Sequence, residues 1–272
     1  MRTFHPRWRR RFPNPIKFYI NYPSLHIVIP NKSFSHSCIV KDLSVLRNVA
    51  KTFNKLKWIL LFSIILSGLV VVQPVFNGED FRLNRDVLKK AELKYGRDAR
   101  QRLLSWEDLI RNDKTSSDLQ KLEKVNRFFN RMEFVDDIQL WGVQDYWATP
   151  IEFISRNAGD CEDFAIAKYF TLKAMGIPEK KLNITYVTAL RYNMPHVVLT
   201  YYAKPDAEPL VLDNLSSTIE MASKRKDLIP IFTFNGTGLW LAHQRGRGKF
   251  AGAGTRVTPW QNLLQRMSDN PL

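Results

Sequence analysis

Apolar residues after position 84 recur first with a helical period and then with a strand period. Residues 85–112 carry an interrupted helical stripe, which Gly96 breaks, and residues 115–132 carry a second stripe. A short helix is predicted from its N-cap at Thr149, with proline at its first position, to Gly159. The pattern therefore predicts helices in this part of the chain, with a loop from Phe134 to the N-cap at Thr149.

The stretch "NAGDCEDFAIAKYFTLKAMGI", residues 157–177, predicts a central helix that opens at Asp160 and stops at Gly176. The period then changes to β-branched and aromatic runs at 183–190, 196–203 and 209–214, and a strand pair is predicted within 229–241. Helices followed by an antiparallel sheet indicate an α+β domain.

Residues 58–76 are apolar and uncharged, with basic residues before them and none after them until Arg82. Such a segment is typical of a signal peptide or an uncleaved signal anchor, and the pattern leaves open which of the two it is. By the positive-inside rule, we expect everything after Phe76 to be exported.

The first 57 residues carry 12 Lys and Arg against the single acid Asp42. This basic extension is predicted either to be a disordered cytoplasmic tail or to lie upstream of a true translation start near Val45 or Leu46, because no methionine occurs between Met1 and Met132. The remaining chain has 29 basic against 25 acidic residues, which argues against a nucleic-acid-binding protein.

The two cysteines, Cys38 and Cys161, lie on opposite sides of the apolar segment, so Cys161 is an unpaired thiol in an exported domain. At the first turn of a helix the macrodipole favours its thiolate. His196 begins a predicted strand and is better placed as a base than His243, which lies beside a glycine-rich linker. Asp213 ends the next strand, so the two strands bring it to the same end of the sheet as His196.

Each of these three residues also has a structural interpretation. A free cysteine is often a small buried apolar residue, a strand histidine is often structural, and an aspartate before asparagine is often a turn residue. Together, and on these elements, Cys161, His196 and Asp213 favour a nucleophile, a base and an orienting acid. The Cys161 N–H can serve an oxyanion, and Trp141 or Trp147 could add an indole N–H or be core residues.

The motifs "GDCEDFA", "MPHVVLTYY" and "LVLDN", with "DYWATPIEF" upstream, resemble those of the bacterial transglutaminase-like cysteine peptidases, and most closely those of the periplasmic LapG type. The resemblance implies a papain-like Cys-His-Asp site in a transglutaminase-like peptidase domain over residues 77–245. It leaves residues 246–272 as a flexible Gly/Arg-rich tail.

The same resemblance implies that calcium is bound by Asp160 and Glu162, while Asp163 either joins them or faces solvent. A divalent cation would offset the carboxylates that disfavour a thiolate at Cys161. The residues alone equally allow these acids to complement the helix N-terminus.

For function, the resemblance implies a periplasmic endopeptidase that cleaves the N-terminal region of a large surface adhesin and promotes biofilm dispersal. An inner-membrane cyclic di-GMP receptor would control it. Two other functions remain open: an acyltransferase or amidase that uses the same three residues, and a non-catalytic, membrane-tethered binding module.

Overall fold

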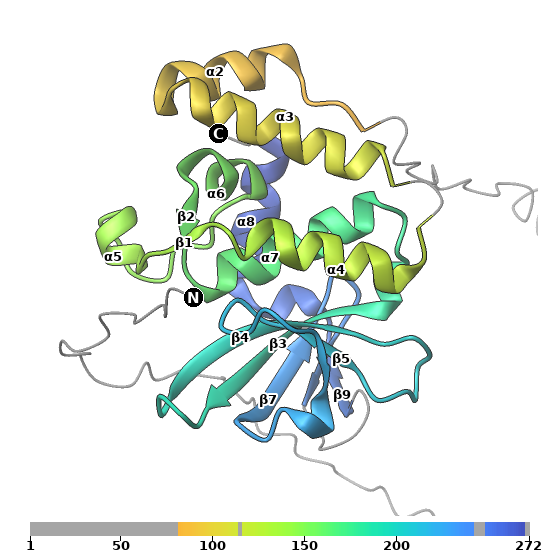
Figure 1. Cartoon of the computed structure of the whole chain (residues 1–272). Coiled ribbons are helices and arrows are strands. Elements are labelled where there is room, and N and C mark those ends of the chain that lie inside the picture. Colours follow the sequence, from red (N-terminus) through yellow and green to blue (C-terminus); the bar gives the residue numbers. More distant parts are fainter. Residues whose placement is uncertain (1–80, 114–115, 242–247, 270–272) are drawn as a thin grey trace, which may run out of the picture. The chain divides into compact units, whose positions relative to one another are not determined.

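The computed structural model describes residues 81–113, 116–241 and 248–269. Helices lie on one side of an antiparallel sheet, as the upper and lower halves of Figure 1 show. The predicted α+β class is confirmed. The predicted extension and the apolar segment 58–76 lie outside the described residues, and no helix within the described part is long and apolar enough to cross a membrane.

The first three helices follow the predicted pattern closely. They are α2 (Arg85–Tyr95), α3 (Arg97–Arg111) and α4 (Asp118–Phe129). Gly96, at φ +88°, separates α2 from α3, as expected for a residue without a Cβ. Ser117 and Gln120 form a capping box that starts α4.

A segment of short elements leads from α4 to the central helix. It contains β1 (Glu133–Phe134), α5 (Asp137–Leu140), α6 (Pro150–Arg156) and β2 (Ala158–Gly159), and β1 pairs with β2 in parallel. Thr149 caps α6 as predicted, but the helix ends at Asn157 rather than at Gly159. Asn157 adopts the left-handed conformation at φ 57°, which asparagine tolerates better than most residues.

The central helix α7 (Cys161–Ala174) is covered on almost every side. It packs on α4 and α6 and on strands β4 and β3 of the sheet. Its buried side chains include Phe164, Ile166 and Tyr169, each less than 4% exposed. The helix that begins with Cys161 is thus held rigidly between the other helices and the sheet.

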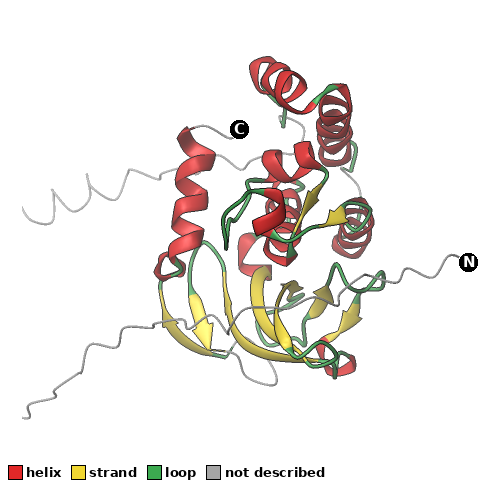
Figure 2. Ribbon diagram, turned by 90° about the vertical axis from the view of Figure 1, so that its left-hand side faces the viewer, coloured by secondary structure: helices red, strands yellow, loops and turns green. Residues whose placement is uncertain are grey.

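The sheet has seven strands in the order β6-β5-β4-β3-β7-β8-β9, and all neighbours are antiparallel. Figure 2 shows its pronounced curvature. The strands are β3 (Leu182–Ala189), β4 (Met194–Tyr201), β5 (Leu210–Leu212), β6 (Glu220–Met221), β7 (Leu228–Phe234), β8 (Leu239–Leu241) and β9 (Lys249–Gly252). Short 3₁₀ turns precede β3 (η2, Glu179–Lys181), join β6 to β7 (η3, Ala222–Lys224) and follow β9 (η4, Gly254–Arg256).

The C-terminal segment differs from the predicted flexible tail. Its described residues form β9, which extends the sheet, and α8 (Thr258–Asp269). Trp260 and Leu263 are at most 1% exposed, and Trp260 stacks on Phe170 at 5.5 Å. The glycine-rich composition suggested a linker, but the apolar side of α8 supplies part of the core.

Candidate active site

Cys161 is the first residue of α7, where the sequence predicts it, and its side chain is half-buried. Gly159 permits the tight approach just before it. A Cβ at Gly159 would overlap the Asp163 carboxylate and lie 2.7 Å from the Phe153 ring. The glycine therefore lets the strand end and the first turn of α7 pack against each other.

His196 and Asp213 meet at one end of the sheet, as the strand pattern predicts. His196 Nε2 lies 2.8 Å from Asp213 Oδ1, and the residues are 3% and 1% exposed. Strand β4 carries the histidine, and the aspartate follows β5 directly. Because Nε2 is engaged by the carboxylate, Nδ1 is the ring nitrogen left to exchange a proton.

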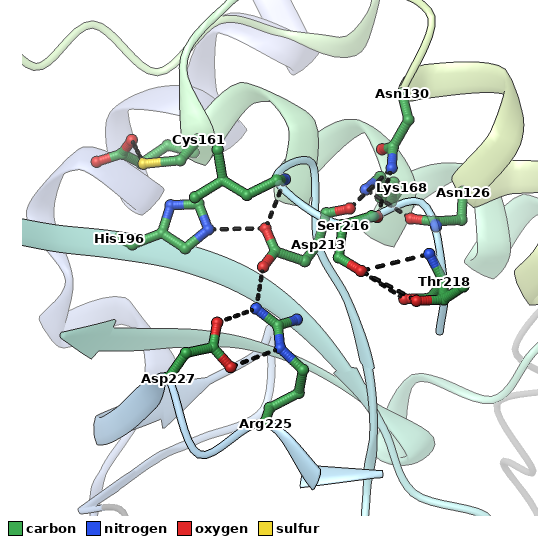
Figure 3. A network of polar contacts seen from close by, with 12 residues as sticks. Asn126, Asn130, Cys161, Lys168, His196, Asp213, Ser216, Thr218, Arg225 and Asp227 are labelled. Atoms are coloured by element: carbon green, nitrogen blue, oxygen red, sulfur yellow. Dashed lines mark hydrogen bonds and ion pairs between the residues drawn. The ribbon is translucent and has the colours of Figure 1, made fainter. Parts of the chain in front are cut away.

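The Cys161 side chain lies beside His196 (Figure 3). Its sulfur faces the backbone N–H of Val197, the residue after the histidine, and its thiol donates to Glu162 Oε2 at 2.8 Å. Burial, followed by the charges of Glu162 and Asp160, raises the pKa of the Cys161 thiol well above its usual value, although the Val197 N–H opposes the shift. Without a bound cation, this site favours the thiol over the thiolate.

The carboxylate of Asp213 is fully engaged. Its Oδ1 also accepts the Leu215 N–H at 2.9 Å, and its Oδ2 accepts from Arg225 Nη2 at 2.7 Å. Arg225 in turn binds Asp227 at 2.8 Å (Figure 3). Burial alone would raise the pKa of Asp213, but the contacts with His196, Leu215 and Arg225 outweigh it and hold that pKa well below its usual range.

A second group of acids gathers at the start of α7. One carboxylate oxygen from each of Asp137, Asp160 and Asp163 lies within 4.8 Å of the other two. Asp137 Oδ2 accepts the Tyr146 N–H at 2.6 Å, and Asp163 Oδ1 accepts the Ala148 N–H at 2.7 Å. In each of the three acids one buried carboxylate oxygen has no hydrogen-bond partner among the residues that the structure describes.

Repulsion among these acids changes their protonation. Burial and the charges of Glu162 and Asp145 raise the pKa of Asp137 to about 7, although the Tyr146 N–H opposes the shift. Burial and neighbouring carboxylates also raise the pKa values of Asp160 and Asp163 well above their usual range. Two buried carboxylates and the half-buried Asp160 disfavour their own ionisation, which a cation bound among them would reverse.

The chain has relatives among known protein families and solved structures. A family model described as bacterial transglutaminase-like cysteine proteinase matches residues 101–227. Legionella pneumophila LapG in its EGTA-treated form is 44% identical over 67% of this chain and 96% of LapG, with a TM-score of 0.60. The chain belongs to the bacterial transglutaminase-like cysteine proteinases. A comparison with curated protein sequences finds no match.

Membership of this cysteine proteinase family confirms the family resemblance and the transglutaminase-like fold predicted from the sequence. Calcium-bound LapG from Legionella pneumophila is 43% identical over 68% of this chain and 99% of LapG, with a TM-score of 0.59. The acids near Cys161 therefore belong to a LapG-like proteinase, and a relative of this proteinase has a calcium-bound structure.

The acids at the start of α7 fit a calcium ion. Calcium takes carboxylate and carbonyl oxygens in flexible geometries, and three unpartnered oxygens converge here. The structure places the predicted ligand Asp160 in this group and shows that Asp163, which is 0% exposed, joins it rather than facing solvent. Glu162 lies close enough to Asp160 to raise its pKa but is not one of the three converging acids, so its role as a ligand stays a prediction.

The tryptophans predicted as possible oxyanion donors have other surroundings. Trp147 is 3% exposed, stacks near Phe234 and donates its indole N–H to Asp145 Oδ1 at 3.0 Å, which makes it a core residue. The Trp141 ring packs against Tyr146 and under the Arg156 guanidinium. His243, the alternative base, lies outside the described residues.

Sequence patterns missed two site residues, Asp137 and Arg225. Asp137 belongs to the four-residue helix α5, within a segment predicted to be loop. Arg225 follows the short turn η3 and has no periodic neighbours that would place it. The adjacent acids in "EFVDDIQLW" were the available signal for Asp137, but a loop does not fix where its side chains point.

Proposed function

We propose that this protein is a cysteine endopeptidase whose catalytic residues are Cys161, His196 and Asp213. The observation that carries the proposal is the buried His196–Asp213 pair at 2.8 Å, placed beside a cysteine at the N-terminus of α7 in a cysteine proteinase family. The order Cys, His, Asp assigns a nucleophile, a base and an orienting acid.

In this mechanism His196 Nδ1 takes the proton of the Cys161 thiol as the sulfur attacks the peptide carbonyl. The histidine then gives that proton to the departing amine, which leaves an acyl group on the sulfur. Water, deprotonated by the same nitrogen, hydrolyses the thioester and restores the thiol. Asp213 keeps the ring oriented throughout because Arg225 and the Leu215 N–H hold its carboxylate.

The carbonyl oxygen under attack also needs hydrogen-bond donors. As the first residue of α7, Cys161 has a backbone N–H without an acceptor inside its own helix, at the positive end of the helix dipole. The Cys161 N–H is therefore the proposed hydrogen-bond donor to the oxyanion.

We further propose that the domain binds calcium through Asp137, Asp160 and Asp163, with Glu162 as an additional ligand. A bound divalent cation would supply the positive charge that these acids lack. With the cation present, the ionised carboxylates would no longer suppress the thiolate of Cys161 to the same extent. The unpartnered oxygens of the three acids support this assignment.

The LapG-type resemblance supports a narrower proposal for the biological role. The protein would act in the periplasm, exported by or anchored through residues 58–76, on the N-terminal region of a large repeat adhesin. Release of the adhesin would promote biofilm dispersal, and an inner-membrane receptor for cyclic di-GMP would restrain the protease through its periplasmic domain.

Incubation with the N-terminal region of the host's largest repeat adhesin tests both the reaction and the metal. We expect two fragments in calcium, loss of cleavage in EGTA, and none from Cys161→Ala. Equal cleavage in EGTA would remove calcium and leave the acids as helix-terminal charges. A crosslinked or amine-bearing product would indicate an acyltransferase. No cleavage together with an unreactive Cys161 would favour the binding module.

A further inference from the structure

A lysine lies in the core behind the candidate catalytic site. Lys168 is 1% exposed and is one of the largest fully buried side chains of the described residues. It stands seven residues after Cys161 on α7, so two helical turns place both residues on the same side of the helix. The proposed mechanism gives it no task.

The ammonium group of Lys168 has a neutral hydrogen-bond partner. Its Nζ donates to Asn126 Oδ1 at 2.8 Å, and Asn126 is itself 1% exposed (Figure 3). Burial lowers the pKa of Lys168 to about 7, and the negative charge of Asp213 partly opposes that shift. The lysine therefore lies within electrostatic reach of the acid that orients His196.

Helix α4 connects this lysine to the segment that carries Asp213. Asn126 lies in the last turn of α4, and Asn130 is the C-cap of that helix. The two residues are four positions apart, so they lie on the same side of the helix. The Asn130 side-chain amide donates to the carbonyl oxygens of Asp213 at 2.8 Å and Ser216 at 3.0 Å. Asn126 Nδ2 reaches the Ser217 carbonyl at 3.5 Å.

These contacts form a continuous connection between the nucleophile and the acid. It runs from α7 through Lys168 to Asn126 on α4, and from the two asparagines to residues 213–217. Lys168 and Cys161 lie on the same helix. A shift of α7 relative to residues 213–217 would therefore disturb the hydrogen bonds of Lys168, Asn126 and Asn130.

Stability alone gives little reason to bury an ammonium group here. Removing a charge from water is costly, and the single hydrogen bond to a neutral amide returns only part of that cost. An unbranched apolar side chain such as methionine would fill the same space. The buried charge is thus better explained by its effect on the neighbouring site.

We propose that Lys168 is a positioning residue: through Asn126 it fixes the helix of Cys161 relative to the segment of Asp213. The inference rests on the proposed peptidase function. It also explains why the core here contains an amide, an ammonium group and backbone carbonyls rather than apolar contacts alone.

Lys168→Met tests this role, with Lys173→Met as the matched control. Lys173 lies on the same helix but pairs with Glu179 at 3.1 Å, away from Asp213. In cleavage assays of the full chain we expect Lys168→Met to lower kcat about tenfold or more with little change in KM, because the reacting groups are misplaced. Its thermal midpoint should change little, because relief of the buried ammonium group opposes the loss of the Asn126 hydrogen bond, and the control should keep its kcat.

The pH profile of kcat/KM separates positioning from general packing. The titratable and charged groups around Asp213 are His196, Arg225 and Lys168, with Asp227 on the far side of Arg225. Removal of one positive charge from this set should displace the pH profile of Lys168→Met but not that of Lys173→Met. Asn126→Ala, which removes the connection and keeps the charge, should lower kcat with a smaller displacement of the profile.

Alkylation of Cys161 by iodoacetamide gives a second measurement that needs no substrate. We expect the rate and its pH dependence to change in Lys168→Met and to remain as in the wild type in Lys173→Met. Wild-type kcat, pH profile and alkylation in Lys168→Met would overturn the inference. So would a loss of activity that only parallels a loss of folded protein. A wild type that alkylates but cuts no adhesin would instead contradict the proposed substrate.

Discussion

The two charged regions on either side of the Cys161 thiol are built on opposite principles. Around Asp213, His196 and Arg225 satisfy both carboxylate oxygens at 2.8 and 2.7 Å. At the start of α7, three acids converge and each leaves one buried oxygen unpartnered within the described structure. The first region is complete in the protein itself, whereas the second leaves carboxylate oxygens that a cation could join.

The difference also appears in the protonation of the two regions. Positive partners hold the pKa of Asp213 well below its usual range, while burial and like charges raise the pKa of Asp137 to about 7. One region is thus ready to orient a histidine at any pH above the acid range. In the other region the protonation of the acids changes with pH. Two of these acids, Asp160 and Asp163, lie in the helix turn that carries Cys161.

Neutralising Asp213 should have the largest effect on activity. Asp213→Asn keeps the shape of the side chain but removes the charge that holds the productive His196 tautomer. We expect kcat to fall about 10³–10⁴-fold, with KM nearly unchanged, in a cleavage assay at saturating calcium. A variant that retains a tenth of the wild-type kcat would show that His196 is oriented by other groups.

Replacing Arg225 should lower the stability of the protein, because Arg225 pairs with the buried Asp213. Arg225 is 6% exposed and leaves a buried carboxylate without its cation when replaced by methionine. We expect Arg225→Met to lower the free energy of unfolding by about 3–5 kcal/mol in urea titrations.

Its matched control is Asp227→Asn, because the Asp227 side chain pairs with the same arginine but is 49% exposed. An exposed partner of this kind contributes about 0–1 kcal/mol. Equal destabilisation by the two variants would mean that the buried pair with Asp213 has no special weight.

Removing calcium should sharpen the contrast between the two regions. We expect EGTA to lower kcat/KM of the wild type about 10–100-fold, a range typical of disturbed metal surroundings. Asp137→Asn should raise the calcium concentration needed for half-maximal activity, because it removes one of the three converging carboxylates. Isothermal titration calorimetry with CaCl₂ measures the same loss directly, and unchanged calcium binding would exclude Asp137 as a ligand.

The sequence predicts the region around Asp213 far better than the group of acids at the start of α7. His196 and Asp213 stand on neighbouring strands whose alternation and connecting turn fix their positions, and Cys161 follows from a helix start. Arg225 and Asp137 come from short irregular segments, where no period fixes the direction of a side chain.

The same limit explains the C-terminal segment. Its glycine and arginine content predicts a flexible tail, yet Trp260 is buried in the core and Arg266 binds Glu152 at 3.1 Å. The contact of Arg266 with Glu152 joins residues 114 positions apart, and no local pattern encodes such a distance. Composition alone does not predict that residues of this segment form β9 and α8, because tertiary contacts decide whether they fold.

The smallest expected effect is on the free energy of unfolding, and here a variant should be more stable than the wild type. In EGTA the folded acids Asp137, Asp160 and Asp163 have raised pKa values, so the folded state binds more protons than the unfolded state between about pH 4 and pH 7. Stability from these groups therefore falls as the pH rises through that window. Asp163→Asn keeps an oxygen for the Ala148 N–H and removes one of the repelling charges.

We expect metal-free Asp163→Asn to be more stable than the wild type by about 1–2 kcal/mol at pH 7.5, and to approach it as the pH falls and the acids take up protons. For a domain of this size that corresponds to a rise in the thermal midpoint of about 2–8 °C. Calcium should reverse the order at pH 7.5, because it stabilises only the protein that retains the full set of ligands. A variant that is less stable than the wild type in EGTA at pH 7.5 would show that the three acids do not repel one another, and the contrast with the Asp213 region would fail at its central point.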